Sequence, residues 1–253
     1  MSSDDFQYSG AELEALAQGD NYYAWIRSLF GDHLRGRVVE VGAGQGTFST
    51  RLLALDSIQE LILIEPDAGM QARLEARFAA EPRVRVAGGY FGEQDLGGRA
   101  DAIVLVNVLE HIEDDAALIT AALEALRPGG ALLLFVPAGQ WLFGPLDRAF
   151  EHFRRYERRE LEDLLRAGGM AIEDVHYVNA PGMLAWFIVG KILRQDTVRP
   201  WQMKLYDRLV IPLVSRLESM VRPPRGQSLM AISVRPATTP TGSAEAAEHR
   251  VPA

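Results

Sequence analysis

Two histidines are the side chains of this sequence best suited to proton transfer. His111 follows Glu110 in the segment NVLEHIEDD, and His152 lies in DRAFEHFRRYERREL. The chain contains no cysteine, which excludes thiolate catalysis, disulfides and cysteine-bound zinc. A neutral imidazole can accept a proton near pH 7 or bind a divalent ion, so we predict His152 as the leading catalytic residue and His111 as the second.

A second group of residues suits a bound cofactor. Glu40, Gly42, Ala43, Gly44 and Gly46 lie in VVEVGAGQGTFSTRLL, where an apolar segment passes through three alternate glycines into a helix-like segment. Glycines at such a turn let a ligand approach the backbone amides at a helix start. Dinucleotide sites need the spacing G-x-G-x-x-G, and here the third glycine comes one residue early.

A carboxylate follows this loop at the spacing that a ribose requires. The segment ELILIEPD places Glu65 and Pro66 at the end of the next apolar run, about 20 residues beyond the glycines. A carboxylate there can accept both ribose hydroxyls. Glu65 alone does not separate S-adenosylmethionine (SAM) from NAD.

The elements that must position these residues alternate along the chain. Short apolar runs are separated by segments with helical spacing of apolar residues, which predicts an α/β fold with a doubly wound, mainly parallel sheet. Strands are expected at 37–42, 60–65, 83–87, 101–107 and 131–137, with two more, at 172–178 and 228–234, pairing antiparallel at the edge.

The motifs together resemble a known family. Glu40-x-Gly42-x-Gly44-x-Gly46 is similar to motif I of the class I SAM-dependent methyltransferases. NVLEHIEDD, LRPGGALLLFVP and NYYAWI resemble segments of the methyltransferase type 11/12-like group that contains the ubiquinone-pathway O-methyltransferases. The resemblance spans roughly residues 21–178 plus the last strand. It implies a Rossmann-like seven-stranded sheet of order 3-2-1-4-5-7-6, with Asn107 beside the methionine part of SAM.

One segment departs from the family pattern. Many members carry an acidic residue after the third strand, near the adenine amino group. Here residues 87–91 read AGGYF, so backbone groups and an aromatic wall would have to hold the adenine.

The resemblance leaves three interpretations of the histidines open. His152 corresponds to a loop histidine of the ubiquinone-pathway enzymes, which implies a base or a substrate-orienting role. The segment also resembles small-RNA 2′-O-methyltransferases, in which such residues bind a divalent metal; Glu110, His111 and His152 would be the ligands, with Asn107 in place of a carboxylate. This metal site is not favoured. The third interpretation is an exposed His152 and a His111 that caps or packs a helix.

The charged segment after His152 also has two interpretations. Arg154, Arg155, Arg158 and Arg159 alternate with glutamates, which favours a solvated helix start with local ion pairs. The alternative is that one or two of the arginines hold an anionic acceptor.

An apolar helical insertion is expected at 180–226. Leu205, Leu209, Leu213, Leu217 and Met220 share one helical face, with a bend at Pro212. The segment is interpreted as a cover packed on the sheet, a lid over an apolar acceptor, a homodimer contact or a peripheral membrane patch. The flanking cations that would suit an anionic surface are Lys191, Arg194, Arg199 and Lys204.

Length and charge limit the remaining possibilities. The chain has 253 residues and a formal net charge of −8, which predicts one domain over 1–236 and disfavours a nucleic-acid partner. No secretory signal is recognised, and the longest apolar run is shorter than the roughly 20 residues that a bilayer span needs. We expect a cytoplasmic protein with peripheral membrane contact as an option. Residues 237–253 are expected to form a disordered tail.

The favoured function is SAM-dependent O-methylation of a small-molecule or lipid-like acceptor by in-line displacement. Two alternatives come from other classes. One is a non-catalytic SAM-fold subunit that binds a partner through 180–226, and the other is a metal-assisted RNA 2′-O-methyltransferase.

Overall fold

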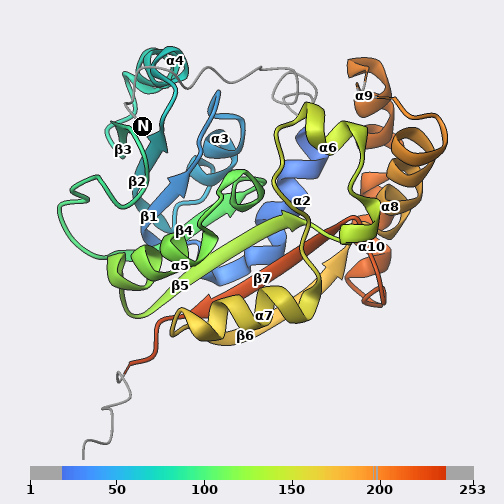
Figure 1. The fold of residues 1–253 in the computed structure, drawn as a ribbon. Helices are drawn as coiled ribbons and strands as arrows, with labels where there is room; N and C mark the ends of the chain where they lie inside the picture. The colour runs from blue at the N-terminus through green and yellow to red at the C-terminus, as the bar shows by residue number, and fades with distance from the viewer. Residues whose placement is uncertain (1–18, 196, 198, 238–253) are drawn as a thin grey trace, which may run out of the picture.

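A seven-stranded sheet organises the protein, as the computed structural model shows for residues 19–195, 197 and 199–237 (Figure 1). The strand order is β3-β2-β1-β4-β5-β7-β6, and β7 runs antiparallel to both of its neighbours. The predicted fold class and strand order are therefore confirmed. The strands are β1 (Gly36–Val41), β2 (Ile58–Glu65), β3 (Val84–Gly88), β4 (Ala100–Val106), β5 (Leu126–Pro137), β6 (Ala171–Val178) and β7 (Ser228–Val234).

Helices cover both faces of the sheet. One face packs against α2 (Asp20–Phe30), α3 (Thr47–Leu53), α4 (Ala68–Phe78) and α10 (Ile211–Glu218), and the other against α5 (Asp115–Ala125) and α7 (Arg158–Ala167). The alternation of strand residues explains this division, because neighbours in a strand face opposite sides. Leu132 and Leu134 join one buried cluster, whereas Leu133 and Phe135 join the other.

Short elements complete the connections around the sheet. The short helices are η1 (Gly31–His33), η2 (Leu109–His111), η3 (Gln140–Leu142) and α6 (Pro145–Ala149). The helix before the fifth strand ends at Ala125, and β5 begins at Leu126, five residues ahead of the strand expected at 131–137. The residue before a proline disfavours helical backbone, so the chain becomes extended early.

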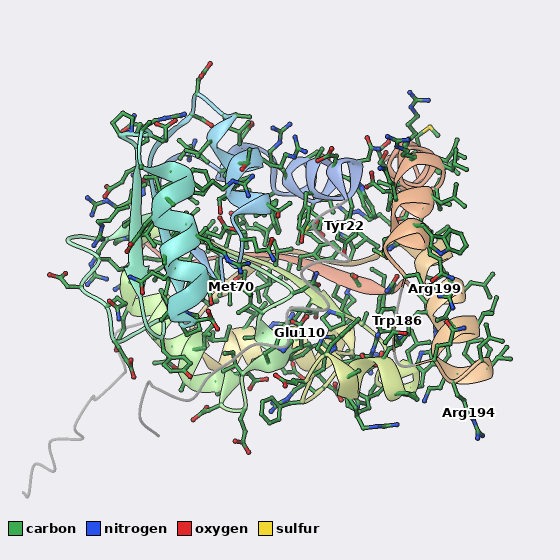
Figure 2. All side chains as sticks on the ribbon, turned by 90° about the horizontal axis from the view of Figure 1, so that it is seen from above. Tyr22, Met70, Glu110, Trp186, Arg194 and Arg199 are labelled. Carbon is green, nitrogen blue, oxygen red and sulfur yellow. The ribbon has the colours of Figure 1, made fainter. Side chains whose placement is uncertain are left out.

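The segment between β6 and β7 is helical. It contains α8 (Ala180–Trp186), a π-helical turn (Phe187–Ile192), α9 (Pro200–Leu209) and α10. The expected single helix with a bend is two helices that meet at Val210, and Pro212 lies in the first turn of α10, where its missing N–H costs nothing. In Figure 2 this segment stands beside the sheet, with Trp186 toward the sheet and Arg194 at its outer end.

The leucines of this segment do not pack on the sheet. The leucine stripe, defined as Leu205, Leu209, Leu213 and Leu217, is 52–61% exposed. The interpretation of this face as a cover packed on the sheet is therefore wrong. The buried residues of the two helices are Asp207, Ile211 and Val214, because α9 and α10 turn a different face toward α2.

Two expectations lie at the limits of the described residues. Of the disordered tail expected at 237–253, only Ala237 is among the described residues. The first residues of the domain expected at 1–236 also lie outside the described residues. None of the helices in the described part of the chain has the length and apolar character needed to span a bilayer.

Candidate active site

The glycine loop lies between β1 and α3 and has a left-handed backbone. Gly42, Gly44 and Gly46 have φ values of 71°, 55° and 77°, which L-residues with side chains rarely adopt. A Cβ on Gly42 would lie 2.6 Å from a methyl group of Val108. Ala43 is buried, and its N–H donates to the Ile64 carbonyl. The structure therefore gives this loop the tight, open-backbone form that the spacing predicted.

Two buried carboxylates flank the loop. The Gly44 N–H donates to Glu65 Oε2 at 2.7 Å, and the Asp67 N–H donates to Glu65 Oε1 at 3.0 Å. Burial raises the pKa of Glu65, and it raises the pKa of Glu40 to about 8. Pro66 lies in the turn between β2 and α4.

The chemistry of the glycine loop and its two carboxylates fits SAM. Among the described residues, Glu40 Oε2 is buried and lacks a hydrogen-bond partner. A ligand with a positive charge and hydroxyl groups would offset the cost of burying this oxygen and the neighbouring Glu65 carboxylate. SAM carries a sulfonium, an ammonium and two ribose hydroxyls. Glu40, Glu65 and the glycine loop are the residues that would hold it.

Asn107 lies at the point where β4 ends. Its φ is 52°, and its N–H donates to the Phe135 carbonyl at 2.8 Å. Asparagine tolerates this conformation better than most residues. Asn107 lines a cavity, and its expected position beside the methionine part of SAM stays a prediction.

The region after β3 contains amide side chains that sequence reasoning missed. A Cβ on Gly88 would lie 2.2 Å from Gln71 Oε1, and one on Gly89 would lie 2.7 Å from Gln94 Nε2. Tyr90 is 41% exposed. Gln71 and Gln94 therefore supply polar groups where the family pattern has an acid. Gln71 lies in α4 and Gln94 three residues beyond Phe91, so neither belongs to the AGGYF segment that the family pattern concerns.

His152 belongs to a buried polar network. It is 8% exposed, and its Nδ1 lies 3.1 Å from Asp147 Oδ1. The same oxygen accepts a hydrogen bond from Arg155 Nε at 2.6 Å, and Asp147 Oδ2 accepts from the Gly144 N–H. The interpretation of His152 as an exposed loop histidine is therefore wrong.

The network fixes the tautomer of His152. Burial opposes ionisation of Asp147, but hydrogen bonds and charge from His152 and Arg155 lower its pKa overall. The ionised Asp147 accepts a hydrogen bond from the Nδ1–H of His152, and in this tautomer the lone pair of the imidazole lies on Nε2. This arrangement is suited to a general base whose protonated form is stabilised by a neighbouring carboxylate.

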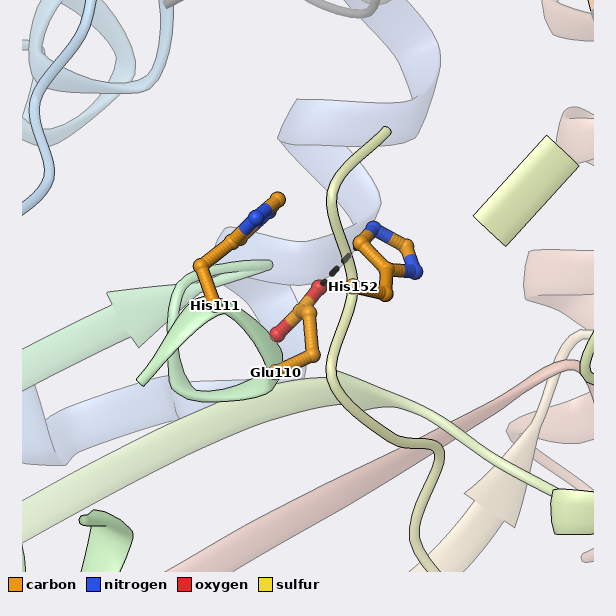
Figure 3. Close-up of side chains that lie close together, drawn as sticks. All are labelled: Glu110, His111 and His152. Atoms are coloured by element: carbon orange, nitrogen blue, oxygen red, sulfur yellow. Dashed lines mark ion pairs between the residues drawn. The ribbon is translucent and has the colours of Figure 1, made fainter. Parts of the chain in front are cut away.

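Glu110, His111 and His152 come together, as Figure 3 shows. His152 Nε2 lies 4.0 Å from Glu110 Oε1, and the two imidazole rings meet edge to face with centroids 4.8 Å apart. One ligand atom from each residue lies within 4.8 Å of the others. These three side chains were the metal candidates predicted from the sequence, and the structure does bring them into one cluster.

The arginines of this segment have different environments. Arg155 is 2% exposed and stacks over Trp186, with its guanidinium carbon 4.6 Å from the ring centroid. Arg154 pairs with Asp115, and Arg158 pairs with Glu162 on the surface of α7. The expectation of a solvated cluster is confirmed for Arg158 and wrong for Arg155.

A cavity of about 200 Å³ lies between this network, Asn107 at the end of β4 and the helical segment. Asn107, Glu110, His152 and Arg155 supply its polar end. The remaining wall is mainly apolar and includes Leu146, Phe150, Trp186, Val189, Met203 and Ile211. Roughly 300–1,000 Å³ is usual for sites of drug-sized ligands, so the cavity suits a small acceptor or the reactive end of a longer one.

The sequence matches the family described as a methyltransferase domain over residues 16–175, and the chain belongs to that family. It is 32% identical over 141 residues to a Mycolicibacterium smegmatis protein named "Probable S-adenosylmethionine-dependent methyltransferase", covering 54% of this chain and 52% of that protein. It is 29% identical over 155 residues to a ubiquinone biosynthesis O-methyltransferase of Xanthomonas axonopodis pv. citri, covering 55% and 64%. The chain thus spans between half and two-thirds of the length of these relatives.

Solved structures show the same fold. A SAM-dependent methyltransferase from Mesorhizobium loti has a TM-score of 0.57 at 16% identity, with 87% of this chain and 100% of that chain covered. The phosphoethanolamine N-methyltransferase 2 of Haemonchus contortus, solved with SAM, has a TM-score of 0.58 at 20% identity, with 86% and 53% covered. The predicted family and its cofactor, SAM, are confirmed.

Proposed function

We propose that the chain transfers a methyl group from SAM to a hydroxyl of a small, largely apolar acceptor. The observation that carries the proposal is the shared cavity. Asn107, which follows β4, and His152 both line this cavity, and the surface of the cavity is mainly apolar. An acceptor held there would present its polar end to His152 and its hydrocarbon part to the helical segment.

The residues of the site divide the work of an in-line displacement. SAM supplies the methyl group and a good leaving group. Glu40, Gly42, Ala43, Gly44, Gly46, Glu65, Pro66 and Asn107 would hold it. His152 removes the hydroxyl proton at Nε2, and Asp147 keeps the ring oriented and stabilises the imidazolium. His111 packs against His152 and restricts its ring.

The relatives support the choice of a hydroxyl acceptor. Two of the sequence features, the NVLEHIEDD segment and the His152 loop, resemble those of ubiquinone-pathway enzymes, and a relative named as a ubiquinone biosynthesis O-methyltransferase matches the chain. Nitrogen acceptors need no strong base, whereas the buried Asp147–His152 pair is suited to removing a proton from oxygen.

A metal-assisted version of the reaction rests on the Glu110–His111–His152 cluster. Two imidazoles and a carboxylate form a mixed donor set for Mn or Zn, and Asp147 would orient His152 as an outer carboxylate. A divalent ion bound there would lower the pKa of an acceptor hydroxyl. Activity that survives chelation, and is not raised by Mg, Mn or Zn, would exclude this version.

Cavity filling tests the acceptor position. We expect Val189→Trp to slow turnover of phenolic and long-chain hydroxyl acceptors, followed by release of S-adenosylhomocysteine, without weakening SAM binding. Ile188→Trp is the matched control, because the adjacent Ile188 is 40% exposed and is not among the residues that line the cavity. Equal activity of both variants would place the acceptor elsewhere.

A further inference from the structure

The outer face of α9 and α10 carries an apolar stripe bordered by cations. Trp201 precedes the leucine stripe by four residues and is 59% exposed. Val210, between the helices, keeps helical backbone angles, so the four-residue spacing continues from α9 into α10. Residues four apart lie above one another on a helix, so these side chains form one continuous surface.

The cations of this surface occupy one border of the stripe. Lys204, Arg208 and Arg216 each directly precede a leucine of the stripe, and all three are exposed. None of them forms an ion pair with a carboxylate in the described part of the chain. This local positive charge contrasts with the formal net charge of −8 for the whole protein.

The acids of the same helices point inward and hold the segment in this orientation. Asp207 is buried and accepts hydrogen bonds from the N–H groups of Asn21 and Tyr22 at the start of α2. Glu218 accepts from the N–H groups of Asn179 and Ala180 at the start of α8. Rotating the leucines inward would break these bonds, so the outward stripe is a stable property of the fold.

We propose that the α9–α10 surface docks on an anionic lipid bilayer. The surface combines large apolar side chains with cations along one border. Among the described residues between Trp201 and Leu217, no acidic side chain is exposed. This composition matches that of helices that lie in a membrane interface. A tryptophan at one end of the stripe suits the headgroup level. A second copy of the chain would bring the same cations face to face, which disfavours a dimer through this surface.

Docking there would also serve the acceptor cavity, a consequence that rests on the proposed function. Gln202, Met203 and Tyr206 of α9 line the cavity, whereas Trp201, Leu205 and Leu209 of the same helix face outward. One helix therefore separates the bilayer from the acceptor site. A lipid-like acceptor would have a short path from the membrane to His152.

Vesicle flotation of the full chain, without cofactor or acceptor, tests docking separately from catalysis. We expect the protein to bind phosphatidylcholine vesicles containing roughly 30% phosphatidylglycerol at least about tenfold more tightly than pure phosphatidylcholine vesicles. Binding should weaken as salt rises from about 0.1 to 0.5 M. Equal binding to both vesicles, or binding to neither, would overturn the proposal.

Two pairs of substitutions sharpen the test. Lys204→Glu/Arg208→Glu should abolish the preference for anionic vesicles, whereas Arg73→Glu/Arg159→Glu, on exposed positions of α4 and α7, changes the net charge equally and should retain it. Leu209→Gln/Leu213→Gln should lose binding with an unchanged melting temperature. A micromolar dimer that this leucine variant dissociates would instead assign the surface to a second copy.

Discussion

The sheet and the α9–α10 pair use apolar residues in opposite ways. In β5, Leu132, Leu133 and Leu134 are all fully buried, whereas Leu209 and Leu213 are each 60% exposed. Both segments are rich in leucine and both are regular. The difference shows that sequence spacing defines which residues share a face, while the rest of the fold decides which face is buried.

The two regions also place their charged groups differently. At the glycine loop, Glu40 and Glu65 are buried beside open backbone, which suits a charged ligand. On α9 and α10 the cations are exposed beside apolar side chains, and the acids are turned inward. The first arrangement suits a small charged ligand, and the second suits an extended anionic partner.

The largest expected effect lies in the glycine loop. Gly44→Val places a branched side chain at a φ of 55° and fills the space that the cofactor needs, so SAM binding should be abolished. Gly129→Val is the matched control: its φ is 76°, but an added Cβ there meets nothing within 4 Å. Calorimetry that finds similar SAM affinities for both variants would remove the loop from the cofactor site.

Next in size is the loss of the base. His152→Ala should slow turnover by about 10²–10⁴-fold while SAM affinity stays unchanged. His176→Ala provides the comparison, because His176 is also buried beside a carboxylate, with Nδ1 3.2 Å from Asp174 Oδ2, but lies on β6. If the two variants retain equal activity, the Asp147–His152 pair has only a structural role.

The buried Glu40 should make SAM binding depend on pH. Because the pKa of Glu40 is about 8, its carboxyl group holds a proton at pH 7 in the ligand-free protein. The contribution of Glu40 to the free energy of unfolding is therefore lost as pH rises from 4.5 through about 8. A cationic ligand favours the carboxylate, so binding releases the proton. SAM affinity should rise by up to about tenfold per pH unit between about pH 6 and 8. Glu40→Gln should flatten this slope in calorimetric titrations.

The smallest effect is expected on the exposed stripe. Leu133→Ala should lower the free energy of unfolding by about 2–5 kcal/mol, because it leaves a cavity in the core. Leu213→Ala should change it by less than about 0.5 kcal/mol, because the side chain is 60% exposed. Urea denaturation distinguishes them, and a large loss for Leu213→Ala would show that the stripe packs against another surface.

The sequence predicted the elements whose function depends on local spacing. The alternating strands, the glycine turn between β1 and α3 and the position of Glu65 at the end of β2 all follow from residue types at fixed intervals, and the structure places each as expected. The cluster of Glu110, His111 and His152 was also predictable, because the segments that carry them follow the carboxyl ends of two neighbouring parallel strands.

The parts that sequence reasoning missed depend on side chains that meet in loops. Asp147 lies in the short helix α6 and Arg155 in the irregular backbone after His152, so no common periodicity indicates that they meet. The interleaved glutamates suggested a solvated cluster, and nothing in the spacing indicated that Arg155 would be buried against Trp186. Helical periodicity found the leucine stripe correctly, but it contained no information on the inward hydrogen bonds of Asp207 that turn the stripe outward.

The most direct test of the account is calorimetric titration of the full chain with SAM and S-adenosylhomocysteine, with NAD as the control ligand. The glycine loop with Glu40 and Glu65 predicts micromolar binding of both sulfur compounds and none of NAD. Adding a hydroxyl acceptor to the SAM complex should then release S-adenosylhomocysteine. Absence of binding by either sulfur compound would contradict the cofactor site, and with it the proposed methyl transfer.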